Sequence, residues 1–303
     1  MKLVFLGTGC SNPTKDRNLS AVALRFEGEW MLFDCAEGTQ RQMVKSSVSY
    51  IKLKYIFLTH FHADHILGLP GLIATMALHE RSEDLHVFGP KGVSQIVNVL
   101  LKFVGENIPF KILCHEIKPQ GGTILKEENF SVTATSLAHN CKCFGFVFKE
   151  KDKEGKFMRK KAESLGIPVG PLYSKLVAGK SVKVEGKVFK PKDVMDYSKG
   201  RKGKKISYIL DTMPNEKYFK AIEDSDILIH EASFSEDEKE RAKEIAHSTA
   251  SQAAEVAKKT NAKKLILTHI SPRYKEDKKI LADAKRIFRN SYIANDFLEL
   301  ELK

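Results

Sequence analysis

The most constraining feature of the sequence is a group of four potential metal ligands that directly follows an apolar run. Residues 60–65 have the sequence His-Phe-His-Ala-Asp-His, and residues 55–59 before them predict a buried strand. One tetrahedral zinc ion seldom takes all its ligands from a single short loop, so two adjacent metal ions explain the spacing better. The alternative is a chance cluster on a solvated loop, which the buried strand before it disfavours.

The same strand ending occurs a second time in the chain. Residues 265–269 have the sequence Leu-Ile-Leu-Thr-His, beside Ile-Phe-Leu-Thr-His at 56–60. This repetition fits two related half-cores that each deliver a histidine from a strand end, although it is also compatible with coincidence. Further strands are expected at 2–6, 206–210 and 227–229, and helices at 68–79 and 248–259 lie between such strands. This alternation predicts an α/β layered core.

Composition limits the class of protein. The chain has 303 residues, 42% of them hydrophobic and 29% charged, which is typical of a globular protein of one large or two smaller domains. No apolar stretch reaches the length of a membrane span, and the apolar run at the N-terminus is too short for a signal peptide. The five cysteines include no C-x-x-C pair and are expected to be reduced thiols. We therefore expect a cytoplasmic protein without a membrane partner.

The positive charge is concentrated in one segment. Residues 149–205 contain 18 Lys and Arg against 7 Asp and Glu, whereas the whole chain has 50 against 38 and a net charge of +12. A local basic field of this kind suits a polyanion, because neutralising phosphates is the usual source of sequence-independent nucleic-acid affinity. A solvated lysine-rich insert is the alternative.

The motif H-x-H-x-D-H after an apolar strand resembles the signature of metallo-β-lactamase-fold hydrolases. The resemblance implies an α/β fold, a four-layer αβ/βα sandwich with a dinuclear metal site at one edge. It also implies further ligands at later strand ends, and the sequence offers His139, Asp211 and His269 in the expected order. Strand ends are places where a scaffold can aim ligands rigidly.

Other motifs narrow the resemblance to ribonuclease Z, the family of tRNA 3′-processing endonucleases, in its short form. The matching segments are Pro13–Asn18, Asp34–Gln40, Gly166–Tyr173, His230–Ser233 and His247–Thr249. One departure follows Asp211, where Met213 occupies the position of an arginine that is usual in the family. The likeness spans essentially the whole chain and implies a homodimer.

The resemblance also assigns roles to residues. It implies two Zn²⁺ per subunit, with Mn²⁺ or Fe²⁺ as alternatives, the first held by His60, His62 and His139 and the second by Asp64, His65 and His269, with Asp211 bridging. A metal-bound hydroxide would attack the phosphodiester and leave a 3′-hydroxyl on the tRNA. Asp64, His247 and Glu231 are the expected catalytic residues, His247 as a general acid held by Glu231. The expected substrate contacts are Lys15, Arg17, Gly170, Pro171, Ser271 and Arg273.

The expected organisation is a catalytic core, residues 1–148 and 206–303, interrupted by a basic flexible arm, residues 149–205, that binds precursor tRNA through its backbone. Two rival functions stay open at this stage. The first is a hydrolase of the same fold for a thioester, lactam or cyclic nucleotide, because one fold hosts many chemistries. The second is a non-catalytic RNA-binding protein that uses metals structurally, which an open dinuclear loop without a closed cysteine cage disfavours.

Overall fold

Two seven-stranded sheets form the centre of the fold. In the computed structural model, which describes residues 1–105 and 107–302, the strand orders are β18-β1-β2-β3-β4-β5-β6 and β17-β16-β15-β14-β9-β8-β7. Strands β3 to β6 are parallel in the first sheet, and β14 to β17 are parallel in the second. Strands β2 and β3 form an antiparallel hairpin near the N-terminus.

The strands have the following bounds. In the first sheet they are β1 (Lys2–Gly7), β2 (Ala21–Phe26), β3 (Glu29–Phe33), β4 (Leu53–Phe57), β5 (Leu85–Gly89), β6 (Ile112–Glu116) and β18 (Glu299–Glu301). In the second they are β7 (Gly122–Lys126), β8 (Phe130–Ser136), β9 (Phe144–Glu150), β14 (Lys205–Ile209), β15 (Ile227–Glu231), β16 (Leu265–Thr268) and β17 (Ser291–Ile293).

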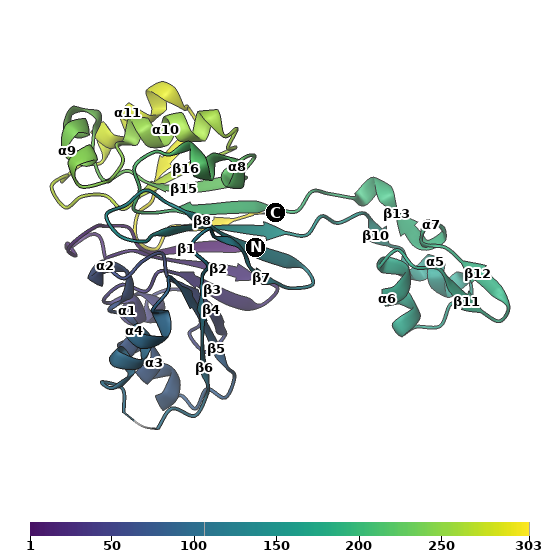
Figure 1. Cartoon of the computed structure of the whole chain (residues 1–303). Coiled ribbons are helices and arrows are strands. Elements are labelled where there is room, and N and C mark those ends of the chain that lie inside the picture. The colour runs from purple at the N-terminus through teal and green to yellow at the C-terminus, as the bar shows by residue number, and fades with distance from the viewer. Residues whose placement is uncertain (106, 303) are drawn as a thin grey trace. The chain divides into compact units, whose positions relative to one another are not determined.

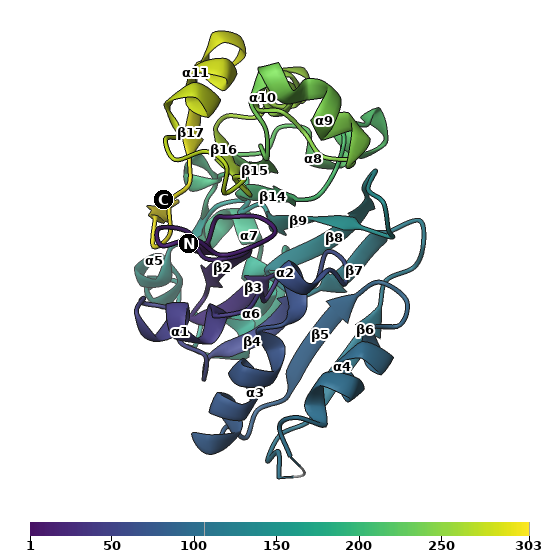
Figure 2. The same cartoon turned by 90° about the vertical axis from the view of Figure 1, so that its left-hand side faces the viewer.

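The helices of the core lie on the outer faces of the two sheets. They are α1 (Thr39–Val44), α2 (Ala63–Ile66), α3 (Leu69–Leu78), α4 (Val93–Leu101), α8 (Phe219–Ile222), α9 (Lys239–Glu244), α10 (Ala250–Lys259) and α11 (Lys278–Ile287), with 3₁₀ turns at Glu216–Tyr218 and Glu236–Glu238. Figure 1 shows α1, α3 and α4 beside the first sheet, and α10 and α11 beside the second. The turned view of Figure 2 shows the same division. The four layers confirm the predicted αβ/βα sandwich.

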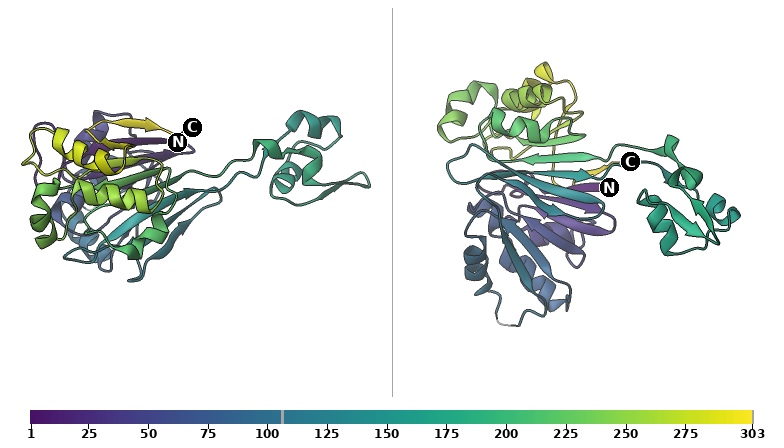
Figure 3. Two further views of the ribbon diagram at one scale, coloured as in Figure 1. Left: turned by 90° about the horizontal axis from the view of Figure 1, so that it is seen from above. Right: turned by 45° about the vertical axis from the view of Figure 1, so that its right-hand side comes forward.

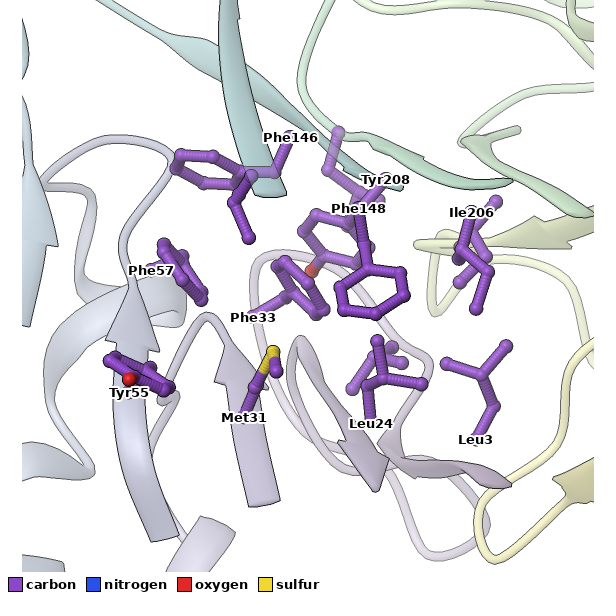
Figure 4. Close-up of a cluster of buried hydrophobic side chains, with 14 of the residues drawn as sticks. Leu3, Leu24, Met31, Phe33, Tyr55, Phe57, Phe146, Phe148, Ile206 and Tyr208 are labelled. Atoms are coloured by element: carbon purple, nitrogen blue, oxygen red, sulfur yellow. The ribbon is translucent and has the colours of Figure 1, made fainter. Parts of the chain in front are cut away.

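Aromatic side chains fill the space between the sheets. Phe33 and Phe57 of the first sheet stack at 5.3 Å between ring centroids, and Phe33 also stacks on Tyr208 of the second sheet at 5.4 Å. Figure 4 shows these rings pointing toward one another from both sheets, with Phe146 beside them. Because Phe146 is fully buried, truncating it to alanine is expected to cost about 3–5 kcal/mol of stability. This rigid middle layer fixes the strand ends that carry the site.

Two further apolar clusters attach the helices. Leu69, Leu72 and Met76 of α3 pack with the outward side chains of the first sheet. The alanine-rich face of α10 packs on Leu228 and Leu265 of the second. In the views of Figure 3 the yellow and green C-terminal helices lie over one face of the core, and the N- and C-terminal strands run side by side. β1 and β18 are indeed paired, antiparallel, with Lys2 opposite Glu301.

Residues 150–204 form a second compact unit, which we call the arm, and residues 1–149 and 205–303 form the first. The boundaries expected from the charge distribution differ from these by one residue. The arm contains β10 (Lys156–Phe157), α5 (Arg159–Ser164), α6 (Pro171–Val177), β11 (Val182–Val184), β12 (Lys187–Phe189), α7 (Pro191–Val194), β13 (Met195–Asp196) and a 3₁₀ turn at Tyr197–Lys199. It has its own small core of Ala162, Ile167, Leu176, Val182 and Val194. None of the helices that the structure describes combines the length and the apolar character needed to cross a lipid bilayer.

Candidate metal centre

Three imidazoles converge at the first half of the candidate centre. His60 follows β4, His62 precedes α2, and His139 follows β8. His60 Nε2 lies 2.9 Å from His62 Nδ1, which lies 3.4 Å from His139 Nε2. Burial and the neighbouring His65 lower the pKa of His60 to about 2, so its ring is neutral. Three imidazole nitrogens at these separations match one face of a tetrahedral metal site.

The second half is formed by Asp64, His65 and His269. Asp64 Oδ2 lies 3.8 Å from Nε2 of His65 and 3.8 Å from Nε2 of His269. Helix α2 holds Asp64 and His65 next to each other, and His269 comes from the end of β16. The backbone N–H of Ser11 donates to Asp64 Oδ2 at 2.9 Å and fixes the carboxylate.

Asp211 lies between the two halves. Its Oδ2 is 3.6 Å from His60 Nε2 and 3.3 Å from His65 Nε2, and its Oδ1 is 3.2 Å from His269 Nε2. The side chain is buried, yet the attraction of His269 and His65 outweighs that burial and holds its pKa well below the ordinary value. An ionised carboxylate facing histidines on both sides is suited to bridging two cations.

Three buried polar atoms in this cluster, His65 Nε2, His269 Nε2 and Asp211 Oδ1, lie close to neighbouring ligand atoms but form no well-directed hydrogen bond among the described residues. Leaving such atoms unpaired costs about 1–3 kcal/mol each, and native structures rarely contain them without a reason. All three belong to side chains of one cluster, and imidazole nitrogens and carboxylate oxygens are zinc ligands. The donor set therefore fits a pair of metal ions.

Asp34, which directly follows β3, helps to orient one histidine in each half of the centre. It accepts from His65 Nδ1 at 2.8 Å and from the Thr59 hydroxyl at 3.0 Å, and the Thr59 oxygen accepts from His60 Nδ1 at 2.9 Å. Tyr208 also donates to Asp34 at 3.0 Å. These bonds engage Nδ1 of His60 and His65 and leave Nε2 of each ring for a metal ion. Histidines that bind metals are commonly oriented through their other ring nitrogen in this way.

A second series of hydrogen bonds orients His269, a candidate ligand in the second half of the centre. His269 Nδ1 donates to Ser233 Oγ at 3.0 Å, and Ser233 donates to Glu231 Oε2 at 2.8 Å. Glu231 also accepts from His247 Nδ1 at 3.0 Å and from the backbone of Thr212. Glu231 is thus tied to a candidate ligand, to the segment after Asp211 and to His247.

His247 lies beside the ligands. Its ring centroid is 5.1 Å from that of His139 and 5.4 Å from that of His269. Burial lowers its pKa, but the Glu231 carboxylate outweighs this and raises the pKa to about 9. With Nδ1 bonded to Glu231, Nε2 carries the proton that the ring can donate.

The backbone is strained at three of these positions. Asp34, Asp211 and His269 have φ of 58°, 54° and 59°, the left-handed region that residues other than glycine rarely occupy. Such conformations cost about 1–3 kcal/mol each and gather at functional sites. Each residue directly follows or closely follows a strand, so the sharp turn aims its side chain across the strand ends.

The expected substrate contacts have different surroundings. Arg17 is largely buried, and its guanidinium donates to Asp277 at 2.6 Å, to Asn295 at 2.9 Å and to the Ala294 carbonyl at 2.7 Å. These bonds hold its loop on the C-terminal segment.

The other expected contacts divide between the core and the arm. Ser271 is buried and accepts from Arg273 Nε at 3.0 Å, and Arg273 also pairs with Glu238. Lys15 is exposed. Gly170 and Pro171 begin α6 in the arm, and Gly170 has a φ of 146°.

Sequence reasoning identified the ligand candidates but missed four residues that orient them: Asp34, Thr59, Tyr208 and Ser233. The motif at 34–40 contained a signal for Asp34, because its acidic residue directly follows an apolar strand. Ser233 lies 36 positions from His269 and Tyr208 lies 174 positions from Asp34, so only the folded sheets bring these partners together.

Comparisons with known proteins agree with this geometry. Residues 177–270 match a family model described as beta-lactamase superfamily domain, and residues 1–154 match one described as Anti-Pycsar protein Apyc1. The crystal structure of human tRNase Z, short form, superposes with a TM-score of 0.73 at 28% identity and full coverage of both chains. Together with the cluster of candidate metal ligands, these matches define a metal-binding hydrolase of the metallo-β-lactamase fold.

Full-length relatives narrow the class. A ribonuclease Z of Methanosarcina acetivorans is 43% identical over all of this chain and 98% of its own length. One of Archaeoglobus fulgidus is 44% identical over 99% of this chain and 97% of its own length. The chain belongs to the ribonuclease Z family.

Proposed function

We propose that this chain is a zinc-dependent endoribonuclease that removes the 3′ trailer from tRNA precursors. The single observation that carries the proposal is the convergence of seven candidate ligands with His247 and Glu231, in a chain whose full-length relatives are ribonucleases Z. The tRNase Z named in the superposed human structure supports tRNA as the substrate class.

The metal ligands in this proposal are His60, His62 and His139 on one side, Asp64, His65 and His269 on the other, and Asp211 between. Two metal ions held there would supply Lewis acidity, which lowers the pKa of water and offsets the charge that develops on the phosphoryl oxygens. The chain itself orients His60 and His65 through Thr59 and Asp34, and His269 through Ser233. Zinc is proposed because the set mixes imidazole with carboxylate, and Mn²⁺ or Fe²⁺ would accept the same donors.

The proton transfers are assigned to side chains of the cluster. Asp64 is positioned by Ser11 to accept a proton from the attacking nucleophile. The leaving 3′-oxygen of the tRNA needs a proton, and His247 donates it from Nε2 because Glu231 keeps the ring protonated. Glu231 therefore acts through His247 and not on the substrate.

The arm is proposed to bind a part of the tRNA that is distant from the scissile bond. Its charge is strongly positive and its lysines are mostly exposed, which suits contacts to the phosphate backbone. Remote binding of this kind orders the substrate before the reaction and lowers the entropic part of the barrier.

The test is incubation of the zinc-loaded protein with a 3′-extended tRNA precursor, beside Asp64→Ala and a deletion of residues 152–195. We expect wild type to release the trailer, Asp64→Ala to release none, and the deletion to bind the precursor much more weakly while still hydrolysing a small phosphodiester. An intact precursor together with hydrolysis of the small phosphodiester would contradict the tRNA assignment and leave the metal assignment in place.

We also propose that the chain acts as a homodimer in the cytoplasm, on the strength of its family resemblance. Light scattering after size-exclusion chromatography should give twice the 34.1 kDa chain mass. A monomer mass at micromolar concentration would contradict the dimer.

A further inference from the structure

A cysteine thiol lies at the first half of the metal centre. Cys141 is exposed and occupies the loop between β8 and β9. One ligand atom from each of His60, His62, His139 and Cys141 lies within 4.8 Å of all the others. The metal assignment from the sequence did not use this sulfur, which is a fourth donor on the side of the three imidazoles.

The loop that carries Cys141 is anchored along its length. The backbone N–H of Leu137 donates to the Cys143 carbonyl at 3.0 Å and closes the loop. Lys142 donates to the Pro119 carbonyl at 2.7 Å, directly after Cys141. Asn140, directly before it, donates to the Ile245 carbonyl at 3.3 Å. The thiol is therefore held near the cluster by both of its neighbours in the chain.

The nearby Cys143 has different surroundings. It is fully buried, its Sγ donates to the Leu210 carbonyl at 3.4 Å, and it lies 3.8 Å from His60 Nδ1. Nδ1 is the nitrogen that bonds Thr59, whereas His60 presents Nε2 to His62. Cys143 thus lies on the outer side of the His60 ring, and Cys141 alone of the two belongs to the group of ligand atoms.

We propose that Cys141 is a further protein ligand of the metal ion in the first half of the centre, beside the three imidazoles and the bridging Asp211. This inference rests on the proposed metal centre and deepens it. On binding, the thiol would release its proton to solvent and the sulfur would bind as a thiolate. A thiolate favours zinc over harder cations such as Mn²⁺ and Mg²⁺, so Cys141 would narrow the metal choice that imidazole and carboxylate leave open.

The position of the sulfur has a consequence for the reaction. Catalytic zinc sites keep one coordination position open for water or substrate. A thiolate at that position would close the first half in the resting enzyme, and it would have to give way when the phosphodiester binds. The resting enzyme would then bind zinc more tightly than a serine variant while offering a less reactive thiol to alkylating reagents.

The first test is substitution with Co²⁺, compared between wild type, Cys141→Ser and the control Cys114→Ser on β6. We expect visible cobalt bands in all three proteins, and a near-ultraviolet sulfur-to-cobalt charge-transfer band in wild type and Cys114→Ser that is absent from Cys141→Ser. Cobalt bands without the charge-transfer band in wild type would overturn the proposal and leave the metal centre intact. No cobalt bands in any protein would overturn the metal centre and this inference together.

The second test uses the exposed thiol directly. Iodoacetamide is added to the full chain with and without bound zinc, and mass spectrometry follows the modification of each cysteine. We expect zinc to slow alkylation of Cys141 by about tenfold or more and to leave the rate at Cys114 unchanged, and Cys141→Ser to lose at least about tenfold in zinc affinity. Equal alkylation rates at Cys141 with and without zinc would overturn the proposal.

Discussion

The metal centre and the arm differ in how they present their functional groups. In the centre, most of the functional side chains are buried or half-buried, and several are held by a second hydrogen-bonded residue, as with His65 on Asp34 and His269 on Ser233. In the arm, a small apolar core supports many exposed cations. Chemistry at a phosphorus atom needs ligands fixed to within a fraction of an ångström, whereas binding a long polyanion needs charge over a wide surface.

This comparison separates two kinds of variant. Changes in the centre should abolish the reaction at any substrate size, and changes in the arm should affect only a substrate large enough to reach it. Variants of the two regions test whether catalysis and tRNA binding are separate in this way.

Replacing Asp211 by asparagine should produce the largest loss. Asparagine keeps the shape of the side chain but carries no negative charge. Two divalent metal ions would then lie close together without a carboxylate between them to offset their mutual repulsion. We expect less than one equivalent of zinc per chain by elemental analysis and at least about a thousandfold loss of activity on both tRNA and a small phosphodiester. Full zinc content with normal activity would contradict the bridging role.

Replacing His247 by alanine should cost about 10²–10⁴-fold in the rate of trailer removal, because the leaving oxygen loses its proton donor. Zinc content should stay at two per chain, which distinguishes this variant from Asp211→Asn. A substrate whose leaving group needs no proton, such as a nitrophenyl phosphodiester, should be affected far less. An equal loss on both substrates would argue against a general acid.

Charge removal in the arm should have a smaller and more selective effect. Lys160, Lys180 and Lys183 of the arm are all exposed. We expect their joint replacement by alanine to weaken precursor tRNA binding by about tenfold or more. The slope of log affinity against log salt should fall by about 0.7–0.9 for each phosphate that the variant no longer neutralises. Hydrolysis of a small phosphodiester should not change.

The matched control changes three exposed lysines of the core, Lys102, Lys258 and Lys259, to alanine. The net charge then falls by the same amount as in the arm variant. Equal weakening of tRNA binding by both triples would show that total charge, and not the arm, determines affinity.

The smallest expected effect concerns the base of the arm. Burial raises the pKa of Glu150, but two hydrogen bonds from Arg201 and one from the Lys204 backbone outweigh burial and lower the pKa below its ordinary 4.5. The stabilisation is therefore present above about pH 4.5 and is lost as the pH falls through the lowered value. Hydrogen exchange of the arm amides, corrected for intrinsic rates, should accelerate a few-fold in acid. Glu150→Gln should show no such pH dependence, and identical profiles for both proteins would contradict the assignment.

Local signals in the sequence predicted the α/β layered core and the ligand cluster at 60–65, whereas the four-layer sandwich and the later ligands followed from the family resemblance. His60, His62, Asp64 and His65 are contiguous with a buried strand, and His269 repeats the same strand ending. The layers follow from apolar strands that alternate with amphipathic helices.

Other features could not be predicted, because they depend on residues that only the fold brings together. Asp34 reaches His65 across 31 positions, and Tyr208 reaches Asp34 across 174. The turn at 63–66 gives too few residues for a helical period, and the short elements of the arm lack one as well. Arg17 matched a family motif, yet the carboxylate and carbonyl groups that engage it come from the distant segment 277–295.

The most direct test of the dinuclear centre is anomalous diffraction at the zinc edge from crystals of the zinc-loaded protein. We expect two peaks about 3.5–4 Å apart, one beside His60, His62 and His139, the other beside Asp64, His65 and His269, with Asp211 between them. A single peak, or a peak outside this cluster, would contradict the claim that these strand ends assemble a dinuclear centre.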